Sequence, residues 1–535
     1  MLQLAALEPA DVGQFLHGTT VVTNLVLERK GARAGMITTE GFRDVLHIAR
    51  HKRPRNFSLH DELPWQRHPL VPRSLRLTVP ERVVPPDGEA LVALDEDAVR
   101  EAARALAAAG VEAVSVCFLF SFLNPAHEQR AAEIVREQLP DAFVSASHEV
   151  APIYREYERF STTALNAYAG PRAAGYIADL EAGLERLGVP GELRLMQSDG
   201  GVASARGAGA RPVSLLISGP VAGLIGGIWA SRLDGFESAI TLDVGGTSAD
   251  IGVAPGGRAK TRHLMDTRVG GYDVMVPMLD IETIGAGGGS IAEVDAGGMF
   301  TVGPQSAGAD PGPAAYGRGG VQATATDANL VLGRLRADHF LGGRMALDPE
   351  RARAALEQEV AARLDMTTEE AALGAITILN HHMIQAIELN SVRRGYDPRT
   401  FALVAFGGAG PLHGCEVAQA LRIPTVVVPP APGITSAVGL LASEISTSAS
   451  RTIFQLTAHA SGERLSADFE VLEEDVRGRL SADGISADRI ALAREADCRY
   501  VGQGYELRVP VGAGAVETDT LSGIAAAYHE AHDRE

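Results

Sequence analysis

A short stretch of the chain combines the residue types that bind phosphate and divalent metal ions. Two carboxylates, two glycines and two hydroxyls follow one another closely at Asp243, Gly245, Gly246, Thr247, Ser248 and Asp250. Glycines let a backbone approach a phosphate and take positive φ, and their N–H groups form an anion nest with neighbouring hydroxyls. We predict that this turn binds nucleotide phosphates, that Asp243 and Asp250 are catalytic, and that Asp243 holds Mg²⁺ through water. An ordinary Gly-Gly hairpin turn with a capping aspartate fits the pattern equally well.

A second glycine turn lies between a strand-like run and a helix-like run. The apolar residues 401–406 lead into a turn made of Gly407, Gly408, Ala409 and Gly410. Such a turn lets a flat base or a phosphate lie against bare backbone, so we predict that these four residues contact the nucleotide. A P-loop is excluded, because none of the three lysines follows a glycine and the pattern GxxxxGK[ST] is therefore absent.

Other polar segments are more ambiguous. His17, Thr19 and Thr20 precede a helix-like run, where the hydroxyls either cap the helix or face a ligand. The glycine run within 280–291 fits a ligand cradle or a tight corner between strands, and 198–201 reads as turn chemistry. Neither an HExxH nor a GxSxG pattern occurs in the sequence.

The elements around these turns follow an α/β pattern. We expect strands at 34–39, 75–84, 111–120, 213–217, 400–406 and 423–428, and a strand pair within 496–511. Helices are expected at 95–110, from 124 onward, at 154–187 with a break at Gly170-Pro171, and within 349–394. The uncharged stretch 212–231 is long enough to span a bilayer, but its glycines and Gly219-Pro220 favour a buried strand, a turn and a helix.

Composition narrows the class of protein. With 535 residues, 46% of them hydrophobic, the chain has ample material for a core. Its net charge of −19 argues against binding to nucleic acid and to anionic membranes. Three widely spaced cysteines fit a reducing compartment, and the N-terminus has no secretory pattern, so we predict a cytoplasmic protein.

The order and wording of these motifs resemble the hydantoinase A / 5-oxoprolinase family. The resembling stretches are HGTTVVTNLVLERKGARAGMITTEGFRDVL (17–46), YERFSTTALNAY (157–168), MQSDGGV (196–202), SGPVAGLIGG (218–227), LDVGGTSADIGV (242–253), DIETIGAGGGSIA (280–292), VGPQSAGADPGPAAYGRGG (302–320), TDANLVLGRL (326–335), SVRRGYDPR (391–399), FGGAGPLHG (406–414) and PPAPGITSAVGLLASE (429–444).

The resemblance implies an actin-like, acetate- and sugar-kinase type α/β ATPase fold with two related lobes. By the same resemblance, 243–250 is the second phosphate motif and 407–410 is the adenosine-side turn. The stretch from His17 through Thr19 and Thr20 would lie on the substrate side. ATP and Mg²⁺ are the implied cofactors, and a hydantoinase B-type subunit is the implied partner within an oligomer.

One departure from the family pattern concerns the ends of the chain. Family members begin with an Asp-x-Gly-Gly-Thr turn, whereas none of the sixteen residues before His17 forms one. We therefore expect an N-terminal lobe over 1–147 that lacks its first phosphate-motif strand pair. A core ATPase lobe over 148–445 and a partial C-terminal domain over 446–535 should follow.

These observations lead to one principal hypothesis and several alternatives. The principal hypothesis is an ATP-dependent hydrolase of a cyclic amide, of hydantoin or 5-oxoproline type, which activates the ring carbonyl by phosphorylation. A ketone carboxylase subunit is the close chemical alternative. The others are an inactive family member that binds nucleotide or a B-type partner, and a plain sugar or acetate kinase.

Overall fold

The computed structural model describes residues 7–51 and 62–534, which form two compact units. The first unit comprises 1–218, 262–278 and 444–535, and the second comprises 219–261 and 279–443. These units do not coincide with the expected ranges 1–147, 148–445 and 446–535, because the chain passes between the two units more than once. The basic, proline-containing sequence at 51–72 predicts a loop, which lies partly outside the described residues; its described end holds the short helix α4 (Pro64–Arg67).

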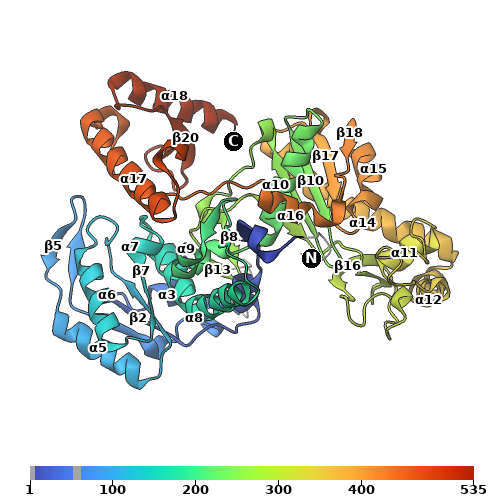
Figure 1. The fold of residues 1–535 in the computed structure, drawn as a ribbon, viewed down its shortest axis with the longest axis horizontal. Helices are drawn as coiled ribbons and strands as arrows, with labels where there is room; N and C mark the ends of the chain where they lie inside the picture. Colours follow the sequence, from blue (N-terminus) through green and yellow to red (C-terminus); the bar gives the residue numbers. More distant parts are fainter. Residues whose placement is uncertain (1–6, 52–61, 535) are drawn as a thin grey trace. The chain divides into compact units, whose positions relative to one another are not determined.

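The first unit contains a parallel sheet with strand order β3-β2-β6-β7. Its strands are β2 (Ala34–Thr39), β3 (Arg76–Val79), β6 (Ala113–Cys117) and β7 (Phe143–Ala146) (Figure 1). Helix α5 (Glu96–Ala108) begins as expected at Asp95, whose carboxylate accepts from the N–H of Ala98 at 2.9 Å. Helix α6 (Ala126–Gln138) follows β6, which confirms the predicted strand–helix alternation.

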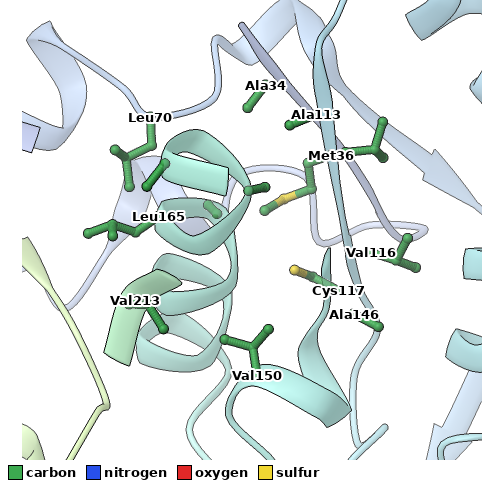
Figure 2. Packing of buried hydrophobic residues seen from close by; sticks show 14 of the residues in the cluster. Ala34, Met36, Leu70, Ala113, Val116, Cys117, Ala146, Val150, Leu165 and Val213 are labelled. Atoms are coloured by element: carbon green, nitrogen blue, oxygen red, sulfur yellow. The ribbon is translucent and has the colours of Figure 1, made fainter. Parts of the chain in front are cut away.

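The long helix α8 (Glu156–Arg186) packs against this sheet and runs straight through Pro171. The expected break at Gly170-Pro171 is therefore wrong. Gly170 is required by packing instead, since a Cβ there would overlap the ring of Phe143. Burial of the helix's N-terminal half outweighs the backbone bond that the proline removes. Figure 2 shows part of this core, with Met36 of β2 and Leu165 of α8 among the labelled side chains.

A smaller sheet of the first unit carries the His17 segment. Strand β1 (Gln14–His17) pairs in parallel with β8 (Glu192–Met196), and β9 (Val202–Ser204) pairs antiparallel with β8. The remaining elements of this unit are η1 (Pro9–Asp11), α2 (Val21–Leu27), α3 (Val45–Ile48), η2 (Arg73–Leu75), β4 (Arg82–Val84), β5 (Glu89–Val92), α7 (Ser147–Val150), α9 (Ala205–Ala210), η3 (Pro212–Leu215), η5 (Leu264–Asp266), β12 (Arg268–Val269), β13 (Tyr272–Asp273), η11 (Thr457–His459), α17 (Gly462–Ala482), η12 (Ala487–Arg489), β19 (Arg494–Cys498), β20 (Leu507–Val511) and α18 (Thr518–Arg534).

The second unit is built on a five-stranded sheet with order β14-β11-β10-β17-β18. The strands are β10 (Ala239–Val244), β11 (Ala249–Ala254), β14 (Ile281–Ile284), β17 (Ala402–Phe406) and β18 (Thr425–Val427). Strands β10, β11 and β14 pair antiparallel in that order, and β17 and β18 then add in parallel beside β10. When the five strands of this sheet are numbered 1 to 5 along the chain, their order in the sheet is 3-2-1-4-5. This order is that of one lobe of an actin-like ATPase, so the predicted fold class is confirmed.

Alternation along β10 assigns its two faces. Ile240, Leu242 and Val244 lie in one apolar cluster with residues of α14 (Thr368–Asn390) and α15 (Gly410–Leu421). The opposite face, with Thr241 and Asp243, meets α10 (Ser218–Leu233). The remaining elements are η4 (Pro255–Gly257), β15 (Ser290–Val294), β16 (Phe300–Ser306), η6 (Ala314–Tyr316), α11 (Ala325–Val331), α12 (Pro349–Leu356), the π-helical turn η7 (Glu357–Ala361), α13 (Ala362–Leu364), η8 (Val392–Arg394), η9 (Pro398–Thr400), η10 (Pro432–Ile434) and α16 (Thr435–Leu441).

The uncharged stretch 212–231 forms helices and no strand. The strand expected at 213–217 is wrong, because Val213–Leu215 lies in a 3-10 turn. The N–H of Val213 is bound by the side chain of Asn166, which draws this backbone away from a ladder. The helix expected after it is α10. No helix within the described ranges has the length and apolarity needed to cross a membrane.

Candidate functional site

Two carboxylates face each other at one end of the central sheet of the second unit. Asp243 of β10 pairs directly with Asp250 of β11 in the antiparallel ladder, and Asp250 pairs with Thr283 of β14. Directly opposed residues project from the same face of a sheet with Cβ atoms about 5 Å apart. The hydroxyl of Thr283 donates to Asp250 Oδ1 at 2.5 Å. The strands thus bring together the two acids predicted as catalytic.

The setting of these acids disfavours their charged forms. Burial, and next the charge of Asp250, raise the pKa of Asp243 to about 6, although a hydrogen bond from Ser436 works in the opposite direction. Burial also raises the pKa of Asp250, against the hydrogen bond from Thr283. A cation beside the pair would relieve this unfavourable charge and restore both carboxylates to the ionised form.

The turn that joins β10 to β11 offers unpaired donors. The N–H of Gly245 bonds the carbonyl of Ser248 at 2.9 Å and closes the turn. In the described part of the chain, the N–H groups of Gly246, Thr247 and Ser248 find no acceptor. Gly246 and Thr247 are exposed, and a Cβ on Gly246 would meet nothing within 4 Å. Consecutive free N–H groups at an exposed turn form an anion-binding nest.

The shape of this turn differs in one respect from expectation. Neither Gly245 nor Gly246 takes positive φ, so that part of the prediction is wrong. The turn is instead held from outside by the glycine run between β14 and β15. The N–H groups of Gly288 and Gly289 bond the carbonyls of Gly245 and Gly246 at 3.0 and 2.6 Å. A Cβ on Gly287 would lie 2.7 Å from the backbone of Thr247, which explains why this run lacks side chains.

The start of helix α11 anchors the same glycine run. Thr326 bonds the carbonyl of Gly288 through both its N–H and its hydroxyl, each at 2.8 Å. Thr324 and the buried Asp327 form a capping box at the helix N-terminus. Asp327 also accepts from the N–H of Ala315 at 2.7 Å. These contacts connect α11 rigidly to the nest.

The second predicted turn, from Gly407 to Gly410, lies beside Asp243 in the same unit. Gly407 has φ +82°, and a Cβ there would overlap Asp243 Oδ1 and lie 2.6 Å from the carbonyl oxygen of Val244. The N–H of Ala409 bonds the Val244 carbonyl at 2.9 Å, and α15 starts at Gly410. The glycines predicted to contact nucleotide therefore border the carboxylate predicted to hold the metal.

Helices α10 and α16 complete the walls of the site. A Cβ on Gly223 of α10 would lie 3.1 Å from Asp243 Oδ2 and 3.2 Å from Ser436 Oγ of α16. Gly226 of α10 and Gly439 of α16 similarly allow close approach, because a Cβ on either would crowd the backbone of the other helix. Small residues at these positions hold the Ser436 hydroxyl against the carboxylate.

The residues predicted for the substrate side belong to the first unit. His17 ends β1, and its Nε2 lies 2.7 Å from the hydroxyl of Tyr176. Burial lowers the pKa of His17, so the ring is neutral at pH 7. The hydroxyl of Thr19 accepts from the N–H of Val21 at 3.1 Å, in keeping with a helix-start role, and that of Thr20 accepts from the Asn24 side chain at 3.2 Å. Their assignment to substrate binding stays a prediction.

Three residues of the site were not predicted from the sequence as site residues. Thr283, Ser436 and Thr326 are single hydroxyl residues in ordinary sequence surroundings. A period-two reading of 280–284 as a strand antiparallel to 249–254 would have aligned Thr283 with Asp250. No comparable local signal points to Ser436, which reaches Asp243 through helix packing.

Comparisons with known proteins agree with this architecture. The model of the hydantoinase/oxoprolinase family matches residues 159–449, and that of the hydantoinase/oxoprolinase N-terminal region matches residues 2–139. The chain is 38% identical to caprolactamase subunit alpha of Pseudomonas jessenii over 98% of this chain and 75% of that protein. It is 34% identical to the acetophenone carboxylase gamma subunit of Aromatoleum aromaticum over 91% of this chain and 68% of that protein.

A solved structure shares the fold as a whole. The crystal structure of the ATP-dependent caprolactamase of Pseudomonas jessenii superposes with a TM-score of 0.89 at 37% identity, covering 98% of this chain and 76% of that one. The two curated relatives are named as subunits of their enzymes. From the family models, the identity over nearly the full chain and the shared fold, we conclude that the chain belongs to the hydantoinase/oxoprolinase family.

Proposed function

We propose that this chain is the ATP-using subunit of an enzyme that hydrolyses a cyclic amide at the expense of ATP. One observation carries the proposal: a nest of free N–H groups at Gly246, Thr247 and Ser248 adjoins the opposed carboxylates Asp243 and Asp250. Phosphates and a hydrated divalent cation are the ligands that suit these two features together. Membership of a family with an ATP-dependent caprolactamase supports the same reading.

The residues of the second unit divide the binding of MgATP between them. The nest would accept the terminal phosphates of ATP, with the Thr247 and Ser248 hydroxyls as further donors. The turn from Gly407 to Gly410, bare of side chains, would lie along the nucleoside part. Asp243 would hold Mg²⁺ through water, and the raised pKa of its buried carboxyl supports this role, because a cation would offset the unfavourable charge.

Mg²⁺ would neutralise negative charge on the phosphates and on the phosphoryl group during its transfer. The protein's own contribution is positioning. Asp250, which accepts a hydrogen bond from Thr283, would orient a water bound to the cation, and the hydrogen bond from Ser436 would help to position Asp243. The backbone N–H groups of the nest would stabilise the charge that builds on the transferred group without rearrangement.

Phosphorylation answers a specific chemical difficulty. An amide carbon is a poor electrophile because nitrogen donates into the carbonyl. The ring carbonyl oxygen attacks the terminal phosphorus of ATP and displaces ADP. The oxygen then carries a phosphoryl group and can later leave as phosphate. Water then adds to the carbon, the ring C–N bond breaks as nitrogen takes a proton, and a second water hydrolyses the acyl phosphate. The products are the open amino acid, ADP and phosphate.

A carboxylase is the second candidate, since the acetophenone carboxylase gamma subunit covers most of the same chain. In that case the phosphorylated group would be an enol or a bicarbonate rather than an amide. The two relatives named as subunits support a need for a partner, for which we propose a B-type hydantoinase subunit. We expect this assembly to be cytoplasmic.

ATP hydrolysis by the chain with Mg²⁺, alone and with a co-expressed B-type partner, tests the proposal. The substrates are hydantoin, 5-oxoproline and ε-caprolactam, with acetone and acetophenone plus bicarbonate as the carboxylase arm. We expect one cyclic amide to stimulate phosphate release and to yield a ring-opened product, and Asp243→Asn to abolish both. Stimulation by a ketone alone would establish the carboxylase. A phosphorylated sugar or acetate would indicate a kinase, and a folded chain without turnover on any substrate would indicate an inactive nucleotide-binding member.

A further inference from the structure

A second polar cluster, outside the nest and the acids, lies in the first unit where β1 and β8 end. These two strands are parallel, with His17 opposite Leu195, so the residues after both strands meet at one edge. Gln197, Ser198 and Asp199 follow β8 directly. Carboxyl ends of parallel strands are where open α/β sheets bind ligands.

Arg211 is brought to this edge by a fixed backbone. The fully buried side chain of Asn166 holds the backbone on both sides of Arg211. Its amide nitrogen donates to the Ala210 carbonyl at 3.4 Å, and its amide oxygen accepts from the N–H of Val213 at 3.1 Å. The Ser214 carbonyl in turn accepts from the N–H of Ser198 at 2.7 Å, which joins the segment of Arg211 to the end of β8.

The guanidinium of Arg211 has no partner. It donates to no acceptor within residues 7–51 and 62–534, and its Nε is fully buried. Burial lowers the pKa of Arg211, Arg479 lowers it further, and Asp199 opposes both. Asp199 is near enough to interact through its charge, yet the two do not form an ion pair. A buried N–H without an acceptor is unfavourable, so an acceptor bound at Arg211 Nε would stabilise the side chain.

Acceptors in the same cluster are also underused. Asp199 accepts from the N–H of Gly201 at 3.0 Å and from no side chain of the described residues, and burial raises the pKa of its carboxyl. The side-chain oxygen of Gln197 is buried and accepts no hydrogen bond in the described part of the chain. A donor on the Arg211 segment and two acceptors after β8 thus belong to the two segments that the Ser198–Ser214 hydrogen bond joins.

We propose that Arg211, Asp199 and Gln197 bind the amide group of the cyclic substrate. The Arg211 guanidinium donates to the ring carbonyl oxygen, the Asp199 carboxylate accepts the ring N–H, and the Gln197 oxygen offers a second acceptor for it. A cis amide in a ring presents one acceptor and one donor side by side, which matches this pattern. The inference rests on the proposed function, because it assigns a binding subsite for the same substrate.

Kinetics with variants of Arg211 test the carbonyl contact. The assay is ATP hydrolysis by the chain with its partner, on the amide that stimulates the wild type. Loss of a hydrogen bond to a charged group costs about 1.5–3 kcal/mol, so Arg211→Met should raise the KM for the amide roughly 10- to 100-fold. Arg211→Lys should recover part of the loss. Arg206→Met, at an arginine of α9 whose side chain is 77% exposed, is the matched control and should leave KM unchanged.

Ring N-methylation tests the Asp199 contact independently. The N-methyl form of the same amide lacks the donor, so the wild type should prefer the N–H form by about tenfold, and Asp199→Leu should lose this preference. Asp199→Asn, which retains an acceptor, should keep part of it. An unchanged KM in Arg211→Met together with an unchanged preference in Asp199→Leu would overturn the inference and leave the proposed function intact.

Direct binding separates the two proposals if no amide stimulates turnover. Hydantoin, 5-oxoproline and ε-caprolactam are then titrated into the folded chain without ATP, and binding is followed by ligand-observed NMR. Binding that disappears in Arg211→Met but persists in Arg206→Met supports the subsite even though the proposed function has failed. No binding of any of the three at millimolar concentration, or equal binding by both variants, overturns it.

Discussion

Gly407→Ala is the sharpest test of how the nucleotide turn is built. Gly407 has φ +82°, and a Cβ would overlap Asp243 Oδ1 and lie 2.6 Å from the Val244 carbonyl oxygen. The left-handed backbone costs an alanine about 1–2 kcal/mol, and the forced displacement of packed atoms about 1–3 kcal/mol more. We therefore expect the second unit to lose roughly 2–5 kcal/mol of stability by the sum of these terms.

The neighbouring glycine provides the matched control. Gly408 is exposed, lacks positive φ, and a Cβ there would meet nothing within 4 Å. Gly408→Ala should change stability by no more than about 0.5 kcal/mol. Denaturant unfolding followed by tryptophan fluorescence measures both variants. In a Trp65→Phe background the signal comes from Trp229 of α10, which belongs to the second unit.

The same pair of variants reports on function. Gly407→Ala should also weaken MgATP binding, because the methyl group pushes Asp243 out of its position between Ser436 and the turn. Equal unfolding midpoints for the two alanine variants would show that the methyl group at position 407 meets no resistance. It would mean that the turn opens freely and that its glycines are not held against the carboxylate.

Three further predictions concern the second unit. Because the pKa of Asp243 in the folded protein is raised to about 6, its contribution to stability is full below its unfolded pKa and is lost as pH rises through 6. Asp243→Asn should therefore abolish turnover yet raise the denaturation midpoint at pH 8. An unchanged midpoint would contradict this expectation. Gly287→Ala should cost about 1–3 kcal/mol and weaken ATP binding, because its Cβ would press on the Thr247 backbone; full ATP affinity in a calorimetric titration would count against it. The pKa of buried His413 is lowered to about 4, so the stability of the protein should fall as pH drops from about 6.5 to 4. A His413→Gln variant, compared in the same denaturation series, should lack that part of the fall. Identical pH profiles would show that His413 does not titrate in this range.

The sequence predicted the elements whose signal is local. Strand β2 has the predicted bounds, Asp95 caps α5 as expected, and the hairpin carrying Asp243 and Asp250 forms where two apolar runs flank a glycine pair. Each depends on neighbours within a few residues, where period-two alternation and capping chemistry act. The fold class came from the resemblance and not from these local signals.

The failures share a different cause, which is tertiary packing. Pro171 sits inside α8 because the helix is buried along its first half, and 213–217 is not a strand because Asn166 binds its backbone. The site shows the same limit. The sequence supplies Asp243 and the glycines, whereas Ser436 reaches Asp243 only through the close approach of α16 to α10. A contact made across helices has no sequence period to reveal it.

We propose that the nest and Asp243 bind ATP together with Mg²⁺. Calorimetric titration of the chain with ATP, with and without Mg²⁺, in the wild type and in Asp243→Asn, tests it most directly. We expect Mg²⁺ to strengthen ATP binding by the wild type, and we expect the variant to lose most of this increase. ATP binding of equal strength with and without Mg²⁺, or a variant indistinguishable from the wild type, would contradict it.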